Sequence, residues 1–376
     1  MIYFDNSATT YPKPKSVIHR MTEAMQLYSF NSGRSGYRES MRSAERIYAV
    51  REKLAAMFGF LPQNIVFTKN CTEALNMAIK GNVKQGDHIL ISSLEHNSVY
   101  RVVHKLFLDG TADYDIFGYS FHQEEILDEI RKRIKDNTRV LICMQASNVF
   151  GVTFPITEIG QLCRERGIRF IVDAAQGAGI LPLNAEKDKI DILCAPGHKS
   201  LLGPMGIGFM AVREGIRLST ITEGGTGSAS SDAQQPEFLP DRFEAGTLNN
   251  PGIIALEKGI DYINENGMQT LYHHEMQMTQ YLFEELFDRD NVLLYTPKPE
   301  LNAFVPIIAF NVYGNSSEKT AALLAKEDIC VRAGYHCSPL AHKHFHTLDS
   351  GTVRISLGCF NTLKECNKFI NVVKKL

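Results

Sequence analysis

The chain has 376 residues, of which 44% are hydrophobic and 22% are charged, as is usual for a soluble globular protein. Its formal net charge of −2 gives no electrostatic basis for binding nucleic acid or an anionic membrane, and no apolar run approaches the roughly 18 residues of a membrane span. The first residues lack a signal-peptide pattern and the eight cysteines form no CxxC pair, which favours reduced thiols and a cytoplasmic location.

The N-terminal region is expected to be an extended arm followed by two helices. Prolines at positions 12 and 14 alternate with other residues, which disfavours a helix in residues 1–15. Helical patterns follow at 16–28 and 39–57, separated by a glycine-punctuated loop at 31–36.

From residue 64 onward, short apolar runs alternate with helical patterns. Strands are expected at 65–67, 89–91, 140–144, 170–172 and 190–194, and helices at 73–79, 124–134 and 156–166. This alternation is typical of an α/β protein with a mostly parallel sheet between helices. Because ligands bind beyond the carboxyl ends of such strands, the polar residues found there are expected to share one pocket. They are Thr72, His96, Asn148, Asp173, Gln176, His198 and Lys199.

Asp173 and Lys199 are the most informative of these residues. A lysine that forms a Schiff base and an aspartate that holds a protonated pyridine nitrogen are what pyridoxal 5′-phosphate (PLP) requires of a protein. Simpler explanations exist, since an aspartate after a strand often caps a helix and a lysine beside glycine is usually solvated. Taken alone, Thr72 is better explained as a helix N-cap and His96 as a structural histidine. Several such residues at five strand ends together indicate one assembled site.

The last third of the chain is expected to form a smaller α/β domain, reached through a helix at 251–265. A polar, glycine-rich stretch at 223–240 lacks the spacing of a P-loop and is interpreted as a long loop. Further elements are predicted as helices at 269–288 and after Asn315, strands at 292–295, 305–312, 329–331 and 353–356, and a terminal helix capped by Thr362 and Glu365. The expected domain limits are an arm at 1–15, a large domain at 16–255 and a small domain at 256–376.

Two chemistries compete for residues 330–359. This stretch is dense in nitrogen and sulfur ligands, and in an extended segment His342, His344 and His346 would share one face that could hold a metal. No pair of them has zinc-finger spacing, however. The alternative is a nucleophilic thiol, because Cys337 lies in a loop bounded by glycine and proline, five residues from Arg332, and nearby positive charge makes a thiol more reactive. An unreactive exposed cysteine is the simplest alternative to both.

Motifs along nearly the whole chain resemble those of cysteine desulfurases, which are fold-type I PLP enzymes of the class V aminotransferases. The matching pieces, in family order, are YFDNSATT at 3–10, NCTEALN at 70–76, EHNSV at 95–99, SNVFG at 147–151, VDAAQGAG at 172–179, GHKSLLGPMGIG at 197–208, FEAGT at 243–247, RAGYHCSPLAH at 332–342 and GTVRISLG at 351–358. The resemblance implies a large PLP-binding domain with a mostly parallel sheet and a smaller C-terminal domain.

By position, the resemblance assigns several residues to the cofactor ring. Lys199 would form the Schiff base, and Asp173 would pair with the pyridine N–H. His96 would stack on the ring and serve as acid or base. Gln176 would bond the phenolic oxygen, and Asn148 would line the ring and its substrate.

Other residues are assigned to the phosphate group. The Cys71 backbone, Thr72 and His198 would hold it, and Thr247 would reach the phosphate of the other subunit in a homodimer. The family often has a serine or threonine two residues before the histidine that precedes the lysine, whereas this chain has Pro196. One hydroxyl is therefore missing, which leaves open whether phosphate binding is weaker.

For the reaction, the resemblance implies that Arg354 binds the substrate carboxylate as a bidentate pair and that Cys337 accepts sulfur from L-cysteine, leaving L-alanine. The short loop around Cys337 is similar to the branch of the family in which sulfur often passes to an acceptor protein. Selenocysteine lyases, cysteine sulfinate desulfinases and C–S β-lyases share the scaffold, so the substrate stays open. A protein that keeps only the scaffold, for sulfur relay or metal binding, is the non-enzymatic alternative.

Overall fold

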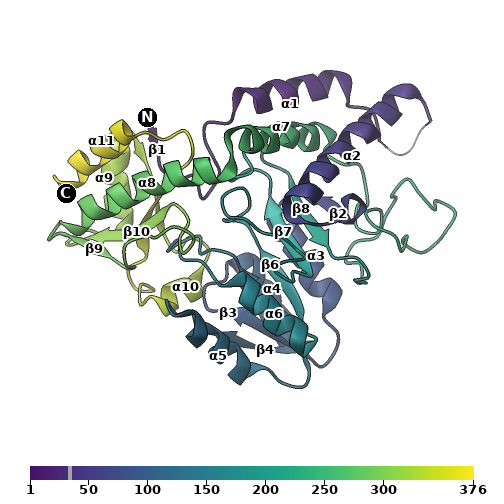
Figure 1. Ribbon diagram of the computed structural model, residues 1–376, viewed down its shortest axis with the longest axis horizontal. Helices are drawn as coiled ribbons and strands as arrows, with labels where there is room; N and C mark the ends of the chain where they lie inside the picture. The colour runs from purple at the N-terminus through teal and green to yellow at the C-terminus, as the bar shows by residue number, and fades with distance from the viewer. Residues whose placement is uncertain (33–35) are drawn as a thin grey trace.

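The computed structural model describes residues 1–32 and 36–376, so part of the loop expected at 31–36 lies outside the described residues. A larger and a smaller β-sheet lie at opposite ends of the molecule, and long helices connect them (Figure 1). Every helix in the described ranges is too short or too polar to cross a membrane.

The larger sheet contains, within the described residues, seven strands in the order β2-β8-β7-β6-β5-β3-β4. Its strands are β2 (Ile65–Thr68), β3 (Asp87–Ser92), β4 (Ala112–Phe117), β5 (Thr138–Met144), β6 (Arg169–Asp173), β7 (Ile192–Pro196) and β8 (Gly208–Val212). Only β8 runs opposite to the other six strands. The predicted mostly parallel sheet is confirmed.

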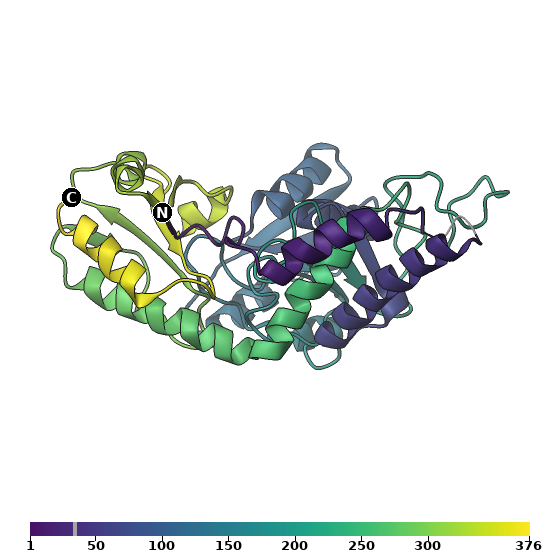
Figure 2. The same ribbon diagram turned by 90° about the horizontal axis from the view of Figure 1, so that it is seen from above.

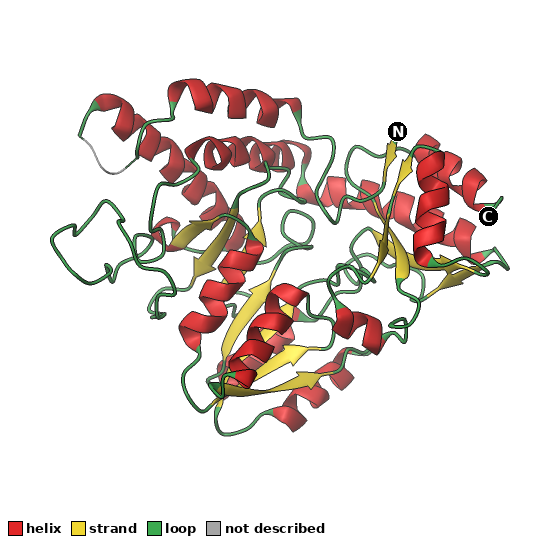
Figure 3. Cartoon of the chain, turned by 180° about the vertical axis from the view of Figure 1, so that it is seen from behind, coloured by secondary structure: helices red, strands yellow, loops and turns green. Residues whose placement is uncertain are grey.

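Helices cover both faces of this sheet, which explains why its strands read as continuous apolar runs (Figure 3). In β6, Phe170 and Val172 belong to one core and Ile171 to the other. The first core is built with α2 (Arg38–Phe58), α5 (Gln123–Arg133), α6 (Ile156–Arg166) and α7 (Asn250–Asn266), with α1 (Lys15–Leu27) packed on α7. The second is built with α3 (Cys71–Asn82) and α4 (Asn97–Leu108).

The smaller sheet is antiparallel and shares a core with C-terminal helices. Its order is β12 (Arg332–Gly334), β13 (Thr352–Ser356), β10 (Ile307–Val312) and β9 (Val292–Leu294), and its helices are α8 (Met268–Phe287), α9 (Ser317–Lys326) and α11 (Leu363–Val373). The expected division between residues 255 and 256 falls inside α7 and remains a prediction.

The smaller sheet and helices α8, α9 and α11 are called the smaller unit, and the larger sheet with its covering helices is called the larger unit. The N-terminal arm begins in the smaller unit. Its first residues form β1 (Ile2–Tyr3), which pairs in parallel with β11 (Ile329–Cys330), so the N-terminus lies among C-terminal elements (Figure 2). Farther along, the Thr10 N–H donates to the carbonyl of His198. The arm therefore connects the smaller sheet with the lysine-bearing turn of the larger one.

Two local expectations around α3 are wrong. Asn70, not Thr72, caps α3, because its side chain accepts a first-turn N–H at 2.9 Å. The helix also continues through Gly81 to Asn82, beyond the expected end at residue 79. A Cβ at Gly81 would lie 2.8 Å from the Ser219 carbonyl oxygen, so the glycine permits close packing and does not end the helix. Similarly, Ser316 and not Asn315 caps α9.

Candidate active site

A pocket of about 520 Å³, part of it open to solvent, lies at the carboxyl ends of the parallel strands. Eight of the eleven predicted site residues line it: Cys71, Thr72, His96, Asn148, Asp173, Gln176, His198 and Lys199. Cys337, Arg354 and Thr247 do not line this pocket.

Asp173 and Lys199 reach the pocket from adjacent parallel strands. Asp173 is 2% exposed, and its Oδ1 accepts the Ala175 N–H at 2.9 Å. Burial raises the pKa of Asp173, whereas the Ala175 N–H and Lys199 lower it. Desolvation lowers the pKa of Lys199, and Asp173 opposes that shift. An amine in such a setting loses its proton more readily and becomes a better nucleophile.

The other end of the pocket is suited to an anion. Cys71 and Thr72 occupy the first turn of α3, where backbone N–H groups have no partner within the helix. The Nδ1 atom of His198 is buried without a hydrogen-bond partner among the described residues. Burial and Lys199 lower the pKa of His198 to about 4, so the ring is neutral at pH 7. Pro196 lines the same pocket and supplies no hydroxyl.

Close backbone packing builds this anion-binding end. Gly208 begins β8 beside the N-terminus of α3, and a Cβ there would lie 2.6 Å from the backbone of Asn70 and 2.9 Å from the nitrogen of Cys71. Glycine is therefore required for the strand to pack against the helix start. The free donors and the orphaned His198 nitrogen together fit the phosphate of PLP.

His96 is both the N-cap of α4 and a wall of the pocket. Its Nδ1 accepts the Ser98 N–H at 3.0 Å, so the neutral ring carries its proton on Nε2. Burial and the positive charge of Lys199 lower the pKa of His96 to about 4. The structural and functional interpretations are therefore compatible, because the cap uses one nitrogen and leaves the other for the pocket.

Cys337 is exposed, and hydrogen bonds hold its loop against the larger unit. The Asn148 side chain donates to the His336 carbonyl at 2.8 Å and accepts the Ser338 hydroxyl at 2.7 Å, so it binds the loop on both sides of Cys337. The Asn97 N–H donates to the Cys337 carbonyl at 2.8 Å. These contacts, which the sequence analysis did not predict, place the thiol loop beside the pocket that Asn148 lines.

The expected proximity of a cation to the thiol also occurs. Arg332 Nη2 lies 3.9 Å from the Cys337 Sγ. His336, next to the thiol, is buried and its Nε2 lies 3.1 Å from the Thr352 carbonyl. Burial and Arg354 lower the pKa of His336 to about 2, which makes it a neutral structural residue and leaves Arg332 as the adjacent cation.

Residues 342–346 do not form the extended face considered for a metal. Helix α10 (Pro339–His344) contains His342, whose Nδ1 bonds the Thr347 hydroxyl at 2.7 Å, and His344, whose Nδ1 lies 3.3 Å from the Ser93 hydroxyl. In the described ranges, no group of three or more His, Cys, Asp or Glu residues could hold a metal ion.

Thr247 is exposed and lines a separate pocket near Asn249.

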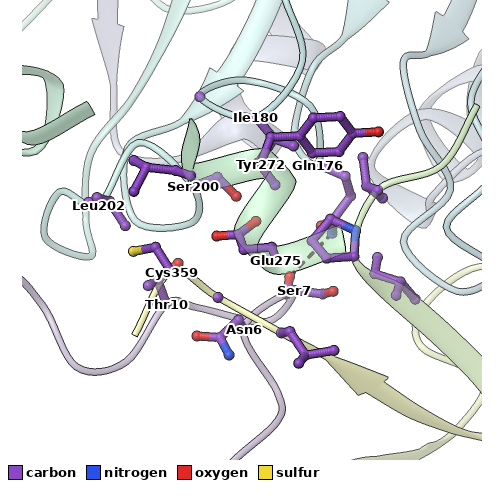
Figure 4. A pocket seen from close by; sticks show the side chains of 17 residues that line it. Asn6, Ser7, Thr10, Gln176, Ile180, Ser200, Leu202, Tyr272, Glu275 and Cys359 are labelled. Carbon is purple, nitrogen blue, oxygen red and sulfur yellow. Dashed lines mark hydrogen bonds between the residues drawn. The ribbon is translucent and has the colours of Figure 1, made fainter. Parts of the chain in front are cut away.

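A second pocket lies where the arm, α8 and the smaller unit meet, and Gln176 lines both pockets (Figure 4). The Glu275 carboxyl group points into it beside Ser200 and Cys359. Its Oε2 is buried with no hydrogen-bond partner among the described residues. Burial raises the pKa of Glu275 to about 8.

We expect Glu275 to make the folded protein less stable as pH rises. The folded state binds the Glu275 proton more tightly than the unfolded state, in which the pKa is about 4.5, so its contribution to stability is complete below that value and is lost toward pH 8. Glu275→Gln should remove this loss, so its melting temperature should exceed that of the wild type increasingly from about pH 5 to pH 8, and by a nearly constant amount above pH 8. Exposed Glu265→Gln is the matched control, and parallel melting profiles for Glu275→Gln and wild type would contradict the assignment.

Comparison with known proteins places this site in a family. The sequence matches the family model Aminotransferase class-V over residues 2–369. The chain belongs to this family. Among class-V aminotransferases, it is 32% identical over 373 residues to a probable cysteine desulfurase of Methanothermobacter thermautotrophicus, a match that covers 97% of this chain and 92% of that protein.

Solved structures agree with the assignment to the class-V aminotransferases. The apo cysteine desulfurase of Thermococcus onnurineus NA1 superposes with a TM-score of 0.92 at 32% identity, covering 100% of this chain and 95% of that one. The cysteine desulfurase CsdA of Escherichia coli gives a TM-score of 0.88 at 25% identity, covering 99% and 94%. The α/β fold of the chain is thus that of cysteine desulfurases.

Proposed function

We propose that this protein is a PLP-dependent cysteine desulfurase that converts L-cysteine to L-alanine and receives the sulfur on Cys337. The main support is the double contact of Asn148, which lines the Lys199 pocket and binds the loop on both sides of Cys337. These contacts bring the Lys199 amine, which is suited to a carbonyl cofactor, to the same place as the exposed Cys337 thiol and its neighbouring cation.

The pocket residues fit PLP as a set. Lys199 would hold its aldehyde, Asp173 its pyridine nitrogen and Gln176 its phenolic oxygen. The first turn of α3 and His198 would hold its phosphate, and Thr247 is proposed to serve the second subunit of a homodimer. When bound, PLP stores the electron pair released at the substrate's α-carbon.

The protein's own side chains carry out the remaining steps. Lys199, with a lowered pKa, accepts the α-proton of the substrate, and the neutral His96 ring presents its Nε2–H to the pocket as a hydrogen-bond donor. Arg354 binds the carboxylate. The Cys337 sulfur, which lies beside the Arg332 guanidinium, attacks the substrate sulfur, so that an S–S bond forms as the C–S bond breaks. The electron pair and protons remain with the carbon fragment as alanine.

Two further properties are proposed. All eight cysteines are free thiols, which supports a reducing, cytoplasmic environment. Because Cys337 is exposed in its short loop, its persulfide could be reached by an acceptor protein.

The products of the reaction test the proposed function. Protein loaded with PLP is incubated with L-cysteine and a reductant, and alanine, sulfide and pyruvate are quantified. We expect alanine and sulfide in equal amounts. Pyruvate in place of alanine would mean β-elimination, a reaction in which Cys337 takes no part, and would overturn the proposal.

A further inference from the structure

The side chain of Arg354 is held by two partners that restrict how it can bind a ligand. Nη1 donates to the Asn148 carbonyl at 2.8 Å, and Nη2 donates to the Asp5 carboxylate at 2.5 Å. The side chain of Arg354 is 2% exposed and that of Asp5 is 21% exposed. Asp5 is part of the N-terminal arm, 349 residues away in sequence.

One nitrogen of this guanidinium has no partner. Nε is buried and has no hydrogen-bond partner among the described residues. Nη2 carries two hydrogens, of which the bond to Asp5 uses one. Nε and Nη2 together form one edge of the guanidinium, and such an edge has the geometry that a carboxylate accepts as a bidentate partner.

Charge reinforces this arrangement. Burial lowers the pKa of Arg354, and the carboxylate of Asp5 opposes that shift, whereas Arg332 adds to it. A buried guanidinium without a counter-charge would be costly, and the cation of Arg332 makes the need greater. Asp5 thus gives Arg354 a counter-charge and fixes it in a site that holds other positive groups.

The arm holds Asp5 in place. The Tyr3 hydroxyl donates to the Asp5 carbonyl at 3.2 Å, and the Ser7 N–H donates to the Ser356 hydroxyl at 2.9 Å. Asp5 also forms a parallel bridge with Ser356 on β13, two residues after Arg354 on the same strand. Backbone pairing therefore helps to hold the Asp5 carboxylate beside the Arg354 guanidinium, in addition to the attraction between their charges.

We propose that Asp5 is a positioning residue for the substrate's carboxylate: it fixes Arg354 so that only the Nε–Nη2 edge remains for a bidentate α-carboxylate. This inference rests on the proposed function insofar as Arg354 is taken to bind the substrate. It assigns to the N-terminal arm a part in selecting amino acids over simple amines.

A pair of ligands that differ only in the carboxylate tests this role without turnover. L-Alanine and ethylamine are titrated against the PLP-loaded protein, and their dissociation constants are read from the cofactor's absorbance. We expect wild type to favour L-alanine. Asp5→Asn should lower that preference by about tenfold, the size of one charge-assisted contact, and leave ethylamine binding within about twofold of wild type.

Two variants separate positioning from general support of the fold. Asp5→Glu keeps the charge but displaces it by one methylene, so its preference should fall less, by about threefold. Ser356→Ala removes one hydroxyl contact of the arm but leaves the backbone bridge between Asp5 and residue 356, so it should keep the wild-type preference. Melting temperatures show which variants fold. If Asp5→Asn does not fold, the result for Asp5→Glu decides the test.

Several results would overturn the inference. They are an unchanged preference in Asp5→Asn or Asp5→Glu, an equal loss for both ligands, or an equal fall in Ser356→Ala. Failure of the wild type to make alanine from L-cysteine would instead overturn the proposed function. The ligand preference can still be measured in that case, so the two failures are distinguishable.

Discussion

Cys337→Ser should bind PLP as wild type does, yet form alanine from L-cysteine slower by about three orders of magnitude or more, because the nucleophile that takes the sulfur is lost. The loop itself should keep its position. Its contacts are made by the Cys337 carbonyl and by the neighbouring residues His336 and Ser338, and none of them needs the sulfur atom. Alanine production at saturating L-cysteine and the visible absorbance of the cofactor are the two measurements.

Cys330→Ser is the matched control for this variant. Cys330 is also a free and partly exposed thiol, but it lies in β11, where it pairs with β1. Its substitution should leave alanine formation within about twofold of wild type, as expected for a residue that does not line the Lys199 pocket. Full activity in Cys337→Ser would remove Cys337 from the mechanism.

Lys199→Ala should lose both the visible band of the bound cofactor and activity with L-cysteine, by about four orders of magnitude. The amine is the group that would hold the aldehyde and later accept the substrate's α-proton. Its loss also leaves Asp173 without the adjacent cation that lowers its pKa, which weakens the site's hold on a protonated pyridine nitrogen.

Lys199→Arg distinguishes charge from nucleophilicity. It restores a cation beside Asp173, but a guanidinium stays protonated and cannot replace the amine. We therefore expect Lys199→Arg to be as inactive as Lys199→Ala, and to lack the visible band as well. Substantial turnover in either variant would contradict the role given to Lys199.

Much of the larger unit could be predicted because patterns among adjacent residues specify most of its strands and helices. Strands buried on both faces are continuous apolar runs, and α6 was expected with its observed limits at 156 and 166. β4 could not be found in this way, since its sequence ADYDIF is half exposed at the sheet edge and lacks such a run. β8 is a short apolar run whose antiparallel direction no periodicity specifies.

The pocket could be predicted for a similar reason, because residues after parallel strands meet at one edge. The thiol loop and the guanidinium could be placed there only by resemblance, since their contacts join distant parts of the chain. Ser338 bonds Asn148 across 190 residues, and Arg354 bonds Asp5 across 349. The motif containing Asp5 was noted as part of the resemblance, but nothing local to it indicates a partner near the other end of the chain.

The most direct measurement is the mass of the peptide that contains Cys337 after PLP-loaded protein has reacted with L-cysteine in the absence of reductant. The proposed mechanism predicts that this peptide gains the mass of one sulfur atom, that reductant removes the gain, and that one alanine is released for each sulfur gained. An unmodified Cys337 in protein that has formed alanine would contradict it, because the sulfur would then have left by another route.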